Sequence, residues 1–160
     1  MYYTIIRKGK ENKKMARTIF FDMDGTIADL YGVDGWLNDL INRNTRPYAE
    51  AKALINLQTL ARVLNRLTRQ GYKVEIISWL AKNSTAEYDE RVAQVKREWL
   101  AKHLASVNFT AINIVEYGTA KQNFIHTETD ILFDDEEQNR INWTGEAHNV
   151  HNIIEVLKSL

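Results

Sequence analysis

The stretch T-I-F-F-D-M-D-G-T-I-A-D, residues 18–29, decides the fold class of this chain. Four strand-prone residues lead directly into two carboxylates, Asp22 and Asp24, with one residue between them. An apolar run that ends on charge is typical of a buried parallel strand where it leaves its sheet, and ligands bind beside the carboxyl ends of such strands. The stretch therefore predicts that both carboxylates lie at a functional edge of a sheet, although Asp-Gly also occurs in ordinary turns.

Size and composition predict one globular domain. The chain has 160 residues, of which 44% are hydrophobic and 26% charged, enough for a single core. Lys plus Arg equals Asp plus Glu, at 21 each, so net charge gives no argument for a nucleic-acid or membrane partner. Cysteine is absent, which excludes thiolate zinc sites and cysteine nucleophiles and favours a cytoplasmic location. No apolar run approaches the ~20 residues of a membrane span.

The domain is expected to cover residues 17–160, with residues 1–16 as an N-terminal extension. Within that extension, residues 2–6 are a candidate edge strand and residues 7–14 a basic loop. Met15 directly precedes the first predicted strand and is a candidate alternative start.

Apolar periodicity predicts alternating strands and helices along the rest of the chain. Strands are expected at residues 18–21, 72–77, 111–115, 130–133 and 147–150. Pro47 and the apolar positions as far as Leu67 predict one helix that Gly71 terminates. Ser84 or Thr85 is expected to cap a second long helix. Shorter helices are expected at residues 36–41, 137–143 and 152–160. A helix between two strands at this spacing predicts a parallel sheet.

In a parallel sheet the strand ends lie on one side, so the polar groups that follow them are expected to meet. These groups are Asp22, Asp24, Ser78, Lys121, Asp134 and Asp135. A carboxylate cluster is costly unless a cation neutralises it, and oxygen donors without His or Cys favour Mg²⁺. The hydroxyl and the ammonium are then suited to phosphate oxygens. One carboxylate is left as a nucleophile that forms an aspartyl-phosphate, and a neighbour two residues away can transfer protons.

Each of these groups also has an ordinary structural interpretation. Ser78 can simply end a strand, and Lys121 can be a solvated lysine, with Lys82 and Lys102 as rivals for its role. Asp134 and Asp135 can cap the helix that follows them.

The order of these residues resembles the haloacid dehalogenase-like (HAD) superfamily. The matching positions are D-M-D-G-T at 22–26, Ser78 after an apolar strand, Lys121, and Asp134-Asp135 after I-L-F. The resemblance extends over residues 18–150. It implies a three-layer α/β/α Rossmann-like fold with a mostly parallel central sheet and a minimal cap at residues 28–46.

The resemblance also implies roles for the acids. Asp22 matches the family nucleophile and a Mg²⁺ ligand, and Asp24 matches the general acid/base whose backbone carbonyl binds the metal. Asp134 matches a metal-ligating acid, which Asp135 supports directly or through water.

The remaining matches concern the phosphate. Thr26 lies in the flap-forming turn after the nucleophile, and Ser78 and Lys121 match the phosphate-binding hydroxyl and lysine. Asn139 falls where some members carry a further acid.

The activity that the resemblance implies is Mg²⁺-dependent hydrolysis of phosphomonoesters. The motifs D-M-D-G-x-x-A-D and I-L-F-D-D-x-x-x-N are similar to those of small 5'(3')-deoxyribonucleotidase-like members, so (deoxy)nucleotides are candidate substrates, although these members carry a longer cap. Tyr31, Trp36 and Tyr48 are candidates either for stacking on a base or for packing within the cap. One alternative is a nucleic-acid end (3'-) phosphatase, which the neutral charge does not support. Another is a non-catalytic HAD-fold protein that binds a phosphorylated ligand or a protein partner.

Overall fold

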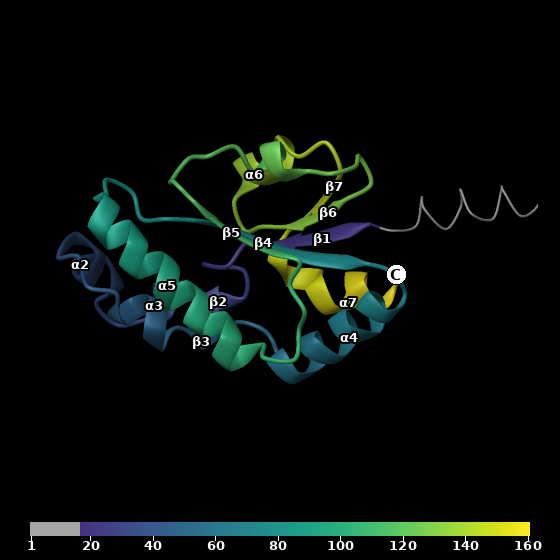
Figure 1. Cartoon of the computed structure of the whole chain (residues 1–160), viewed down its shortest axis with the longest axis horizontal. Helices are drawn as coiled ribbons and strands as arrows, with labels where there is room; N and C mark the ends of the chain where they lie inside the picture. Colours follow the sequence, from purple (N-terminus) through teal and green to yellow (C-terminus); the bar gives the residue numbers. More distant parts are fainter. Residues whose placement is uncertain (1–16) are drawn as a thin grey trace, which may run out of the picture.

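The computed structural model describes residues 17–160. The predicted extension of residues 1–16, with its candidate strand and alternative start, lies outside the described residues. These residues form a five-stranded parallel sheet in the order β5-β4-β1-β6-β7, flanked by helices (Figure 1). The strands are β1 (Thr18–Phe21), β4 (Lys73–Trp79), β5 (Ala111–Val115), β6 (Ile131–Phe133) and β7 (Glu146–His148). The predicted α/β class with a parallel central sheet is confirmed.

The helices cover the two faces of the sheet unequally (Figure 1). The long ones, α4 (Leu57–Arg69) and α5 (Ala86–His103), lie on one face together with α7 (Ile153–Lys158), which follows the short turn η3 (Val150–Asn152). Among residues 17–160, the other face carries η2 (Lys121–Phe124), α6 (Glu137–Ile141) and connecting loops. The layer on this second face of the sheet is therefore thinner than the helical layer on the first.

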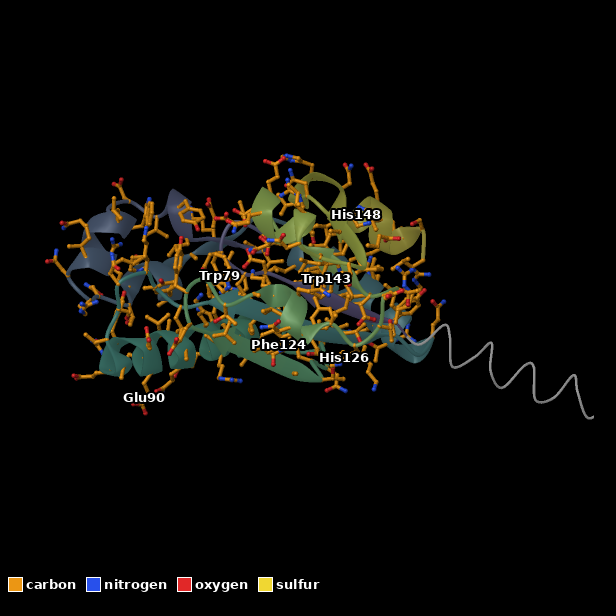
Figure 2. The ribbon with its side chains drawn as sticks, turned by 90° about the horizontal axis from the view of Figure 1, so that it is seen from above. Trp79, Glu90, Phe124, His126, Trp143 and His148 are labelled. Atoms are coloured by element: carbon orange, nitrogen blue, oxygen red, sulfur yellow. The ribbon has the colours of Figure 1, made fainter. Side chains whose placement is uncertain are left out.

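Alternate residues of the central strand supply the two cores, as the period of two in a strand requires. Ile19 and Phe21 pack into the larger core beneath α4, α5 and α7. Phe20 points to the other face, which Figure 2 shows from above, and contacts the ring of Trp143 edge-on at 5.2 Å between centroids. The smaller core on that face is formed by Phe20, Ile77, Leu132 and Trp143.

The single helix predicted from Pro47 to Leu67 is wrong. The structure has two helices there, α3 (Arg46–Glu50) and α4, and the strand β3 (Lys52–Ala53) separates them. This strand pairs antiparallel with β2 (Ala28–Asp29). The pairing joins segments that are distant in sequence, and such tertiary contacts override a local helical pattern.

Local signals at both ends of α4 agree with its shorter span. The Asn56 side chain accepts a hydrogen bond from the backbone N–H of Thr59 at 3.0 Å, which is the usual contact of an N-terminal cap. Leu54, which the helical pattern placed on the apolar face, is 47% exposed. At the other end, the helix stops before Gly71 as predicted, and that glycine has a positive φ of 101°.

The remaining elements lie close to their predicted positions. Thr85, rather than Ser84, caps α5, since its side chain accepts from the backbone N–H of Tyr88. β5 has the predicted bounds, whereas β4 continues through Ser78 to Trp79. In residues 17–160, no helix is long and apolar enough to cross a membrane.

The segment between β2 and β3 forms a small cap beyond the carboxyl ends of the sheet strands (Figure 1). It consists of η1 (Leu30–Gly32), α2 (Trp36–Ile41) and α3. Arg46 holds the cap together, because its guanidinium donates to Asp39 at 2.5 Å, to Glu50 at 2.8 Å and to a backbone carbonyl of the cap at 2.6 Å.

The cap rests on the first half of α5. Leu30 and Tyr48 of the cap form one buried cluster with Tyr88 and Val92 of that helix. The Tyr88 hydroxyl also donates to the backbone carbonyl of Asn44 at 2.8 Å. One helix thus positions the cap relative to the sheet.

Asp130, just before β6, organises the loop that leads to it. The carboxylate is fully buried and accepts from the backbone N–H groups of Thr18, His126 and Thr127 at 2.9–3.0 Å. It also accepts from the hydroxyl of Thr127 at 2.9 Å. Four donors converge on this one side chain.

We expect Asp130→Ala to lower the free energy of unfolding by at least about 3 kcal/mol, because it leaves several donors without their acceptor at about 1–3 kcal/mol each. Urea denaturation of the purified variants measures this change. Glu128→Ala, at an exposed position of the same loop, is the matched control and should change stability by less than about 0.5 kcal/mol. Equal stability of the two variants would show that the Asp130 contacts contribute little.

Candidate functional site

A tight turn holds the acidic residues that follow β1. The carbonyl of Met23 accepts from the backbone N–H groups of Thr26, Ile27 and Ala28 at 2.9–3.1 Å. Gly25 has φ +80°, and a Cβ at this position would lie 2.3 Å from a carboxylate oxygen of Asp135. Only glycine meets both conditions without strain, so this residue permits the approach of Asp135 to the turn.

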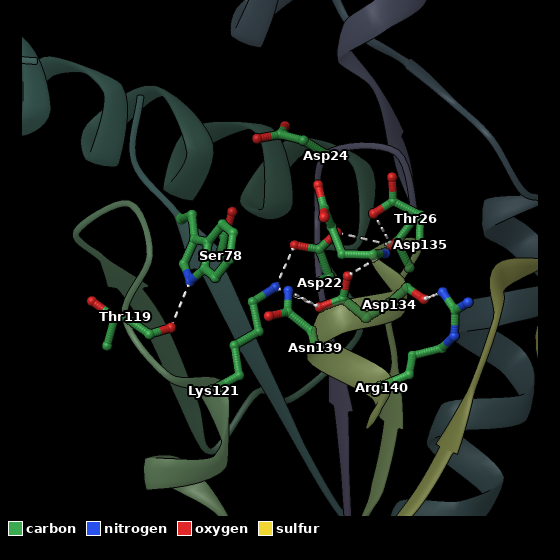
Figure 3. A network of polar contacts seen from close by, with 12 residues as sticks. Asp22, Asp24, Thr26, Ser78, Thr119, Lys121, Asp134, Asp135, Asn139 and Arg140 are labelled. Carbon is green, nitrogen blue, oxygen red and sulfur yellow. Dashed lines mark hydrogen bonds and ion pairs between the residues drawn. The ribbon is translucent and has the colours of Figure 1, made fainter. Parts of the chain in front are cut away.

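Three of the four predicted metal-binding acids converge beside this turn (Figure 3). Asp22, Asp134 and Asp135 each offer a carboxylate oxygen, and these oxygens lie within 4.8 Å of one another. Parallel pairing of β1 with β6 causes the convergence, because the backbone N–H of Asp22 donates to the carbonyl of Phe133 at 3.0 Å. Asp22 and Asp134 are buried, and Asp135 is half-buried.

Lys121 joins two of these acids. Its ammonium donates to Asp22 Oδ1 at 2.8 Å and to Asp134 Oδ2 at 2.7 Å, and the side chain is almost completely buried (Figure 3). Burial alone would lower the pKa of Lys121, but the charges of Asp22 and Asp134 outweigh it and raise the pKa above its usual range. Lys121 is therefore a fixed positive charge within the cluster.

Neutral donors complete the surroundings of the cluster. The Thr26 hydroxyl donates to Asp22 Oδ2 at 2.9 Å. Asn139 donates to Asp134 Oδ2 at 3.0 Å, and the backbone N–H of Glu136 donates to Asp134 Oδ1 at 2.9 Å. The structure thus places Thr26 and Asn139 against the acids.

Burial and mutual repulsion disfavour the charged forms of Asp134 and Asp135, the two acids that follow β6. Burial, followed by the charge of Asp22, raises the pKa of Asp134 to about 6, although Lys121 opposes the change. The same two causes raise the pKa of Asp135 to about 8. A cation bound here would relieve the repulsion.

The fourth acid, Asp24, has a separate partner that sequence analysis missed. Lys96 of α5 donates to Asp24 Oδ2 at 2.8 Å, to Ser78 Oγ at 2.7 Å and to the carbonyl of Trp79 at 2.7 Å. The lysine is 1% exposed and Ser78 is fully buried. Burial raises the pKa of Asp24, and the charge of Lys96 offsets this only in part.

A signal for Lys96 was present in the sequence. Tyr88, Val92 and Trp99 define the apolar stripe of α5, and Lys96 lies on the same stripe, four residues after Val92. A lysine on a buried helical face requires a charged or polar partner. The rivals that sequence analysis named for Lys121 were Lys82 and Lys102, and Lys102 is exposed.

A cavity of about 500 Å³ opens above Asp22 and Asp24, between the cap and the loops after β4 and β5. Two aromatic pairs line it. Tyr31 and Trp36 of the cap meet edge-on at 5.0 Å between ring centroids, and Trp79 and Tyr117 meet at 5.1 Å on the side of the sheet loops.

Of the three aromatic residues that were candidates for base stacking or for cap packing, Tyr48 has the least exposed surface. Its side chain is 4% exposed, and the ring centroid lies 5.1 Å from the ammonium of Lys96. Tyr31 is 49% exposed at the cavity, and Trp36 is half-buried. The packing interpretation therefore describes Tyr48 better, whereas Tyr31 and Trp36 present ring surface to the cavity.

The residues present fit a Mg²⁺ ion. The converging donors are all carboxylate oxygens, the type that this ion prefers. Three acids lie together with one ammonium group between two of them, so a divalent cation would offset the repulsion that arises when all three are ionised. Asp22, Asp134 and Asp135 are the residues that would hold it.

Comparisons with known proteins find no relative by sequence and a distant similarity among solved structures. No protein-family model matches the chain, and no curated protein matches it. Among solved structures, it is similar to D,D-heptose 1,7-bisphosphate phosphatase from Burkholderia thailandensis, with 15% sequence identity and a TM-score of 0.49. The similarity covers 78% of this chain and 70% of that chain.

We expect Asp135→Asn to change how stability depends on pH in protein stripped of metal with EDTA. The folded wild type retains the Asp135 proton up to a pKa of about 8, whereas the ordinary value is 3.8. Since the unfolded chain releases this proton first, the Asp135 contribution to stability falls as pH rises from about 4 to 8. The amide that replaces the carboxyl group cannot ionise, so the variant should lose less stability than wild type over this range.

Urea denaturation at pH 5, 6, 7 and 8 measures the difference, with Asp34→Asn at an exposed position as the control. A variant that loses as much stability as wild type between pH 6 and 8 would contradict the prediction. Mg²⁺ should raise the Tm of wild type more at pH 8 than at pH 5, because it counters charges that are then fully present.

Proposed function

We propose that this protein is a Mg²⁺-dependent phosphomonoester hydrolase of the HAD type. The observation that carries the proposal is the convergence of Asp22, Asp134 and Asp135 within 4.8 Å, with Lys121 bonded to the first two. The cavity above them has room for a phosphorylated small molecule.

Asp22 is the proposed nucleophile. One of its carboxylate oxygens attacks phosphorus and forms an O–P bond, while the bond between phosphorus and the leaving oxygen breaks. Asp24 gives its proton to that departing oxygen. In the second step Asp24 takes a proton from water as the water oxygen attacks phosphorus, and the bond to Asp22 breaks to release phosphate and restore the carboxylate.

The surrounding residues stabilise charge on the transferring group. Ser78 and Lys121 are the proposed donors to phosphate oxygens. Thr26 orients Asp22 through the bond from its hydroxyl. Asp22, Asp134 and Asp135 would hold a Mg²⁺ ion, which would supply positive charge for the phosphoryl transfer. The raised pKa of Asp24 suits an acid that must hold a proton at neutral pH.

For the substrate, we propose a (deoxy)nucleotide. The cavity joins the acidic cluster to two aromatic pairs, one from the cap and one from the sheet loops. Flat aromatic rings on either side suit a planar base, and the nearby acids suit its phosphate once a cation is bound.

Hydrolysis of p-nitrophenyl phosphate tests the activity. We expect wild type to turn over this substrate with Mg²⁺ and to lose activity in EDTA. Asp22→Asn, which removes the nucleophile while preserving shape, should lower kcat at least about a thousandfold. Asp34→Asn controls for loss of a carboxylate, and circular dichroism verifies the fold. A folded wild type that binds phosphate without turnover would overturn the proposal and favour the non-catalytic alternative.

Trp36→Ala tests the nucleotide assignment. On a panel of 5'- and 3'-(deoxy)nucleotides, the preferred substrate should show a KM about tenfold higher in the variant and a nearly unchanged kcat, because stacking contributes about 1–3 kcal/mol of uniform binding. Glycerol phosphate, which has no base, is the control and should show no change in KM. An unchanged KM for every nucleotide would count against base stacking. Sugar phosphates and 3'-phosphorylated oligonucleotides complete the panel.

A further inference from the structure

A buried lysine outside the recognised motifs contacts two of the proposed functional residues. The ammonium of Lys96 has three acceptors, which are Asp24 Oδ2, Ser78 Oγ and the carbonyl of Trp79. An ammonium has three N–H donors, so these contacts occupy all of them. Lys96 therefore has no donor left for a substrate, and its effect must pass through the residues that it holds.

The first of these effects is on Asp24. Lys96 bonds Oδ2 of this carboxyl group, so negative charge is favoured on that oxygen and a proton is favoured on Oδ1. The lysine thereby determines which oxygen carries the proton. The Asp24 side chain lies at the floor of the cavity, where the departing oxygen of a substrate would be.

The second effect is on Ser78. A hydroxyl has one hydrogen and two acceptor positions. Since Ser78 Oγ already accepts from Lys96 at 2.7 Å, its own hydrogen must point away from the ammonium. The hydroxyl is thus left as a donor, which is the role that phosphate binding requires.

The position of Lys96 on α5 links both effects to the cap. Tyr88 and Val92, on earlier turns of this helix, pack against the cap residues Leu30 and Tyr48. The Tyr48 ring also lies 5.1 Å from the Lys96 ammonium. Helix α5 therefore supports the cap and also carries the lysine that orients the Asp24 carboxyl group and the Ser78 hydroxyl.

We propose that Lys96 is a positioning residue, which directs the proton-bearing oxygen of Asp24 toward the oxygen that leaves the substrate phosphate. The inference rests on the proposed function, in which Asp24 protonates the oxygen that departs from phosphorus. If Lys96 had a purely structural role, the result would differ. Replacing the lysine would then change stability without affecting one substrate more than the other.

Lys96→Met tests the inference by its dependence on the leaving group. We compare kcat/KM for p-nitrophenyl phosphate and for glycerol phosphate, since this parameter reports the step that forms the aspartyl-phosphate. p-Nitrophenolate departs with little protonation, whereas an alkoxide needs the acid, whose contribution is about 10²–10⁴-fold. We expect kcat/KM to fall about a hundredfold for glycerol phosphate and less than about tenfold for p-nitrophenyl phosphate. Lys102→Met, an exposed change on the same helix, should leave both values unchanged.

A double-mutant comparison with Asp24→Asn shows whether Lys96 acts through Asp24. The Asp24→Asn variant has no acidic proton to direct, so adding Lys96→Met to it should lower kcat/KM for glycerol phosphate by less than about threefold. Equal losses on both substrates in the single variant, or a full additional loss in the double variant, would overturn the inference. If Lys96→Met does not fold, Lys96→Gln is compared by the same criteria.

The outcomes separate this inference from the proposed function. If wild type hydrolyses neither substrate with Mg²⁺, the proposed function fails and this inference fails with it. If wild type hydrolyses both, and Lys96→Met behaves like Lys102→Met, only the role of Lys96 is wrong.

Discussion

Repulsion among carboxylates at the ends of β1 and β6 is the constraint on which the rest of this site depends. Asp22, Asp134 and Asp135 are brought within 4.8 Å by the pairing of two parallel strands, and burial deprives them of the water that would screen their charges. Lys121 offsets part of this repulsion, because its ammonium is buried between Asp22 and Asp134 and donates to both. One lysine does not balance three ionised acids, and a bound cation would relieve the repulsion that is left.

The two buried lysines divide four nearby acids into two environments. Lys121 comes from the loop side of the sheet and contacts the acids that would share a metal. Lys96 comes from the opposite helical layer and contacts only Asp24 among them. Two carboxyl groups separated by one residue can perform different chemistry only if their surroundings differ. The different origins of the two lysines supply that difference.

Much of the site was predictable because strand ends carry it. Apolar runs that stop at Asp22, Ser78 and Asp134 are local signals, and parallel pairing then requires the ends to meet. Lys96 was not predicted, because its partners Asp24 and Ser78 come from segments that are distant in sequence. The predicted helix through Lys52–Ala53 failed for a similar reason, since only the antiparallel partner Ala28–Asp29 makes that segment a strand.

The cap and the proposed acid, Asp24, both contact α5, so the position of each is tied to this helix. A ligand held against Tyr31 and Trp36 is located by a cap that packs on Tyr88 and Val92. Asp24 is located by Lys96, about one turn further along the same helix. Because Tyr88, Val92 and Lys96 lie on one helix, the geometry of that helix contributes to the distance between the cap surface and Asp24. Proton transfer requires the leaving group to lie within hydrogen-bond reach of its acid, and a misplacement of about 1 Å can be costly. Under the proposed function, a shared helix would limit such misplacement even though the cap itself is small.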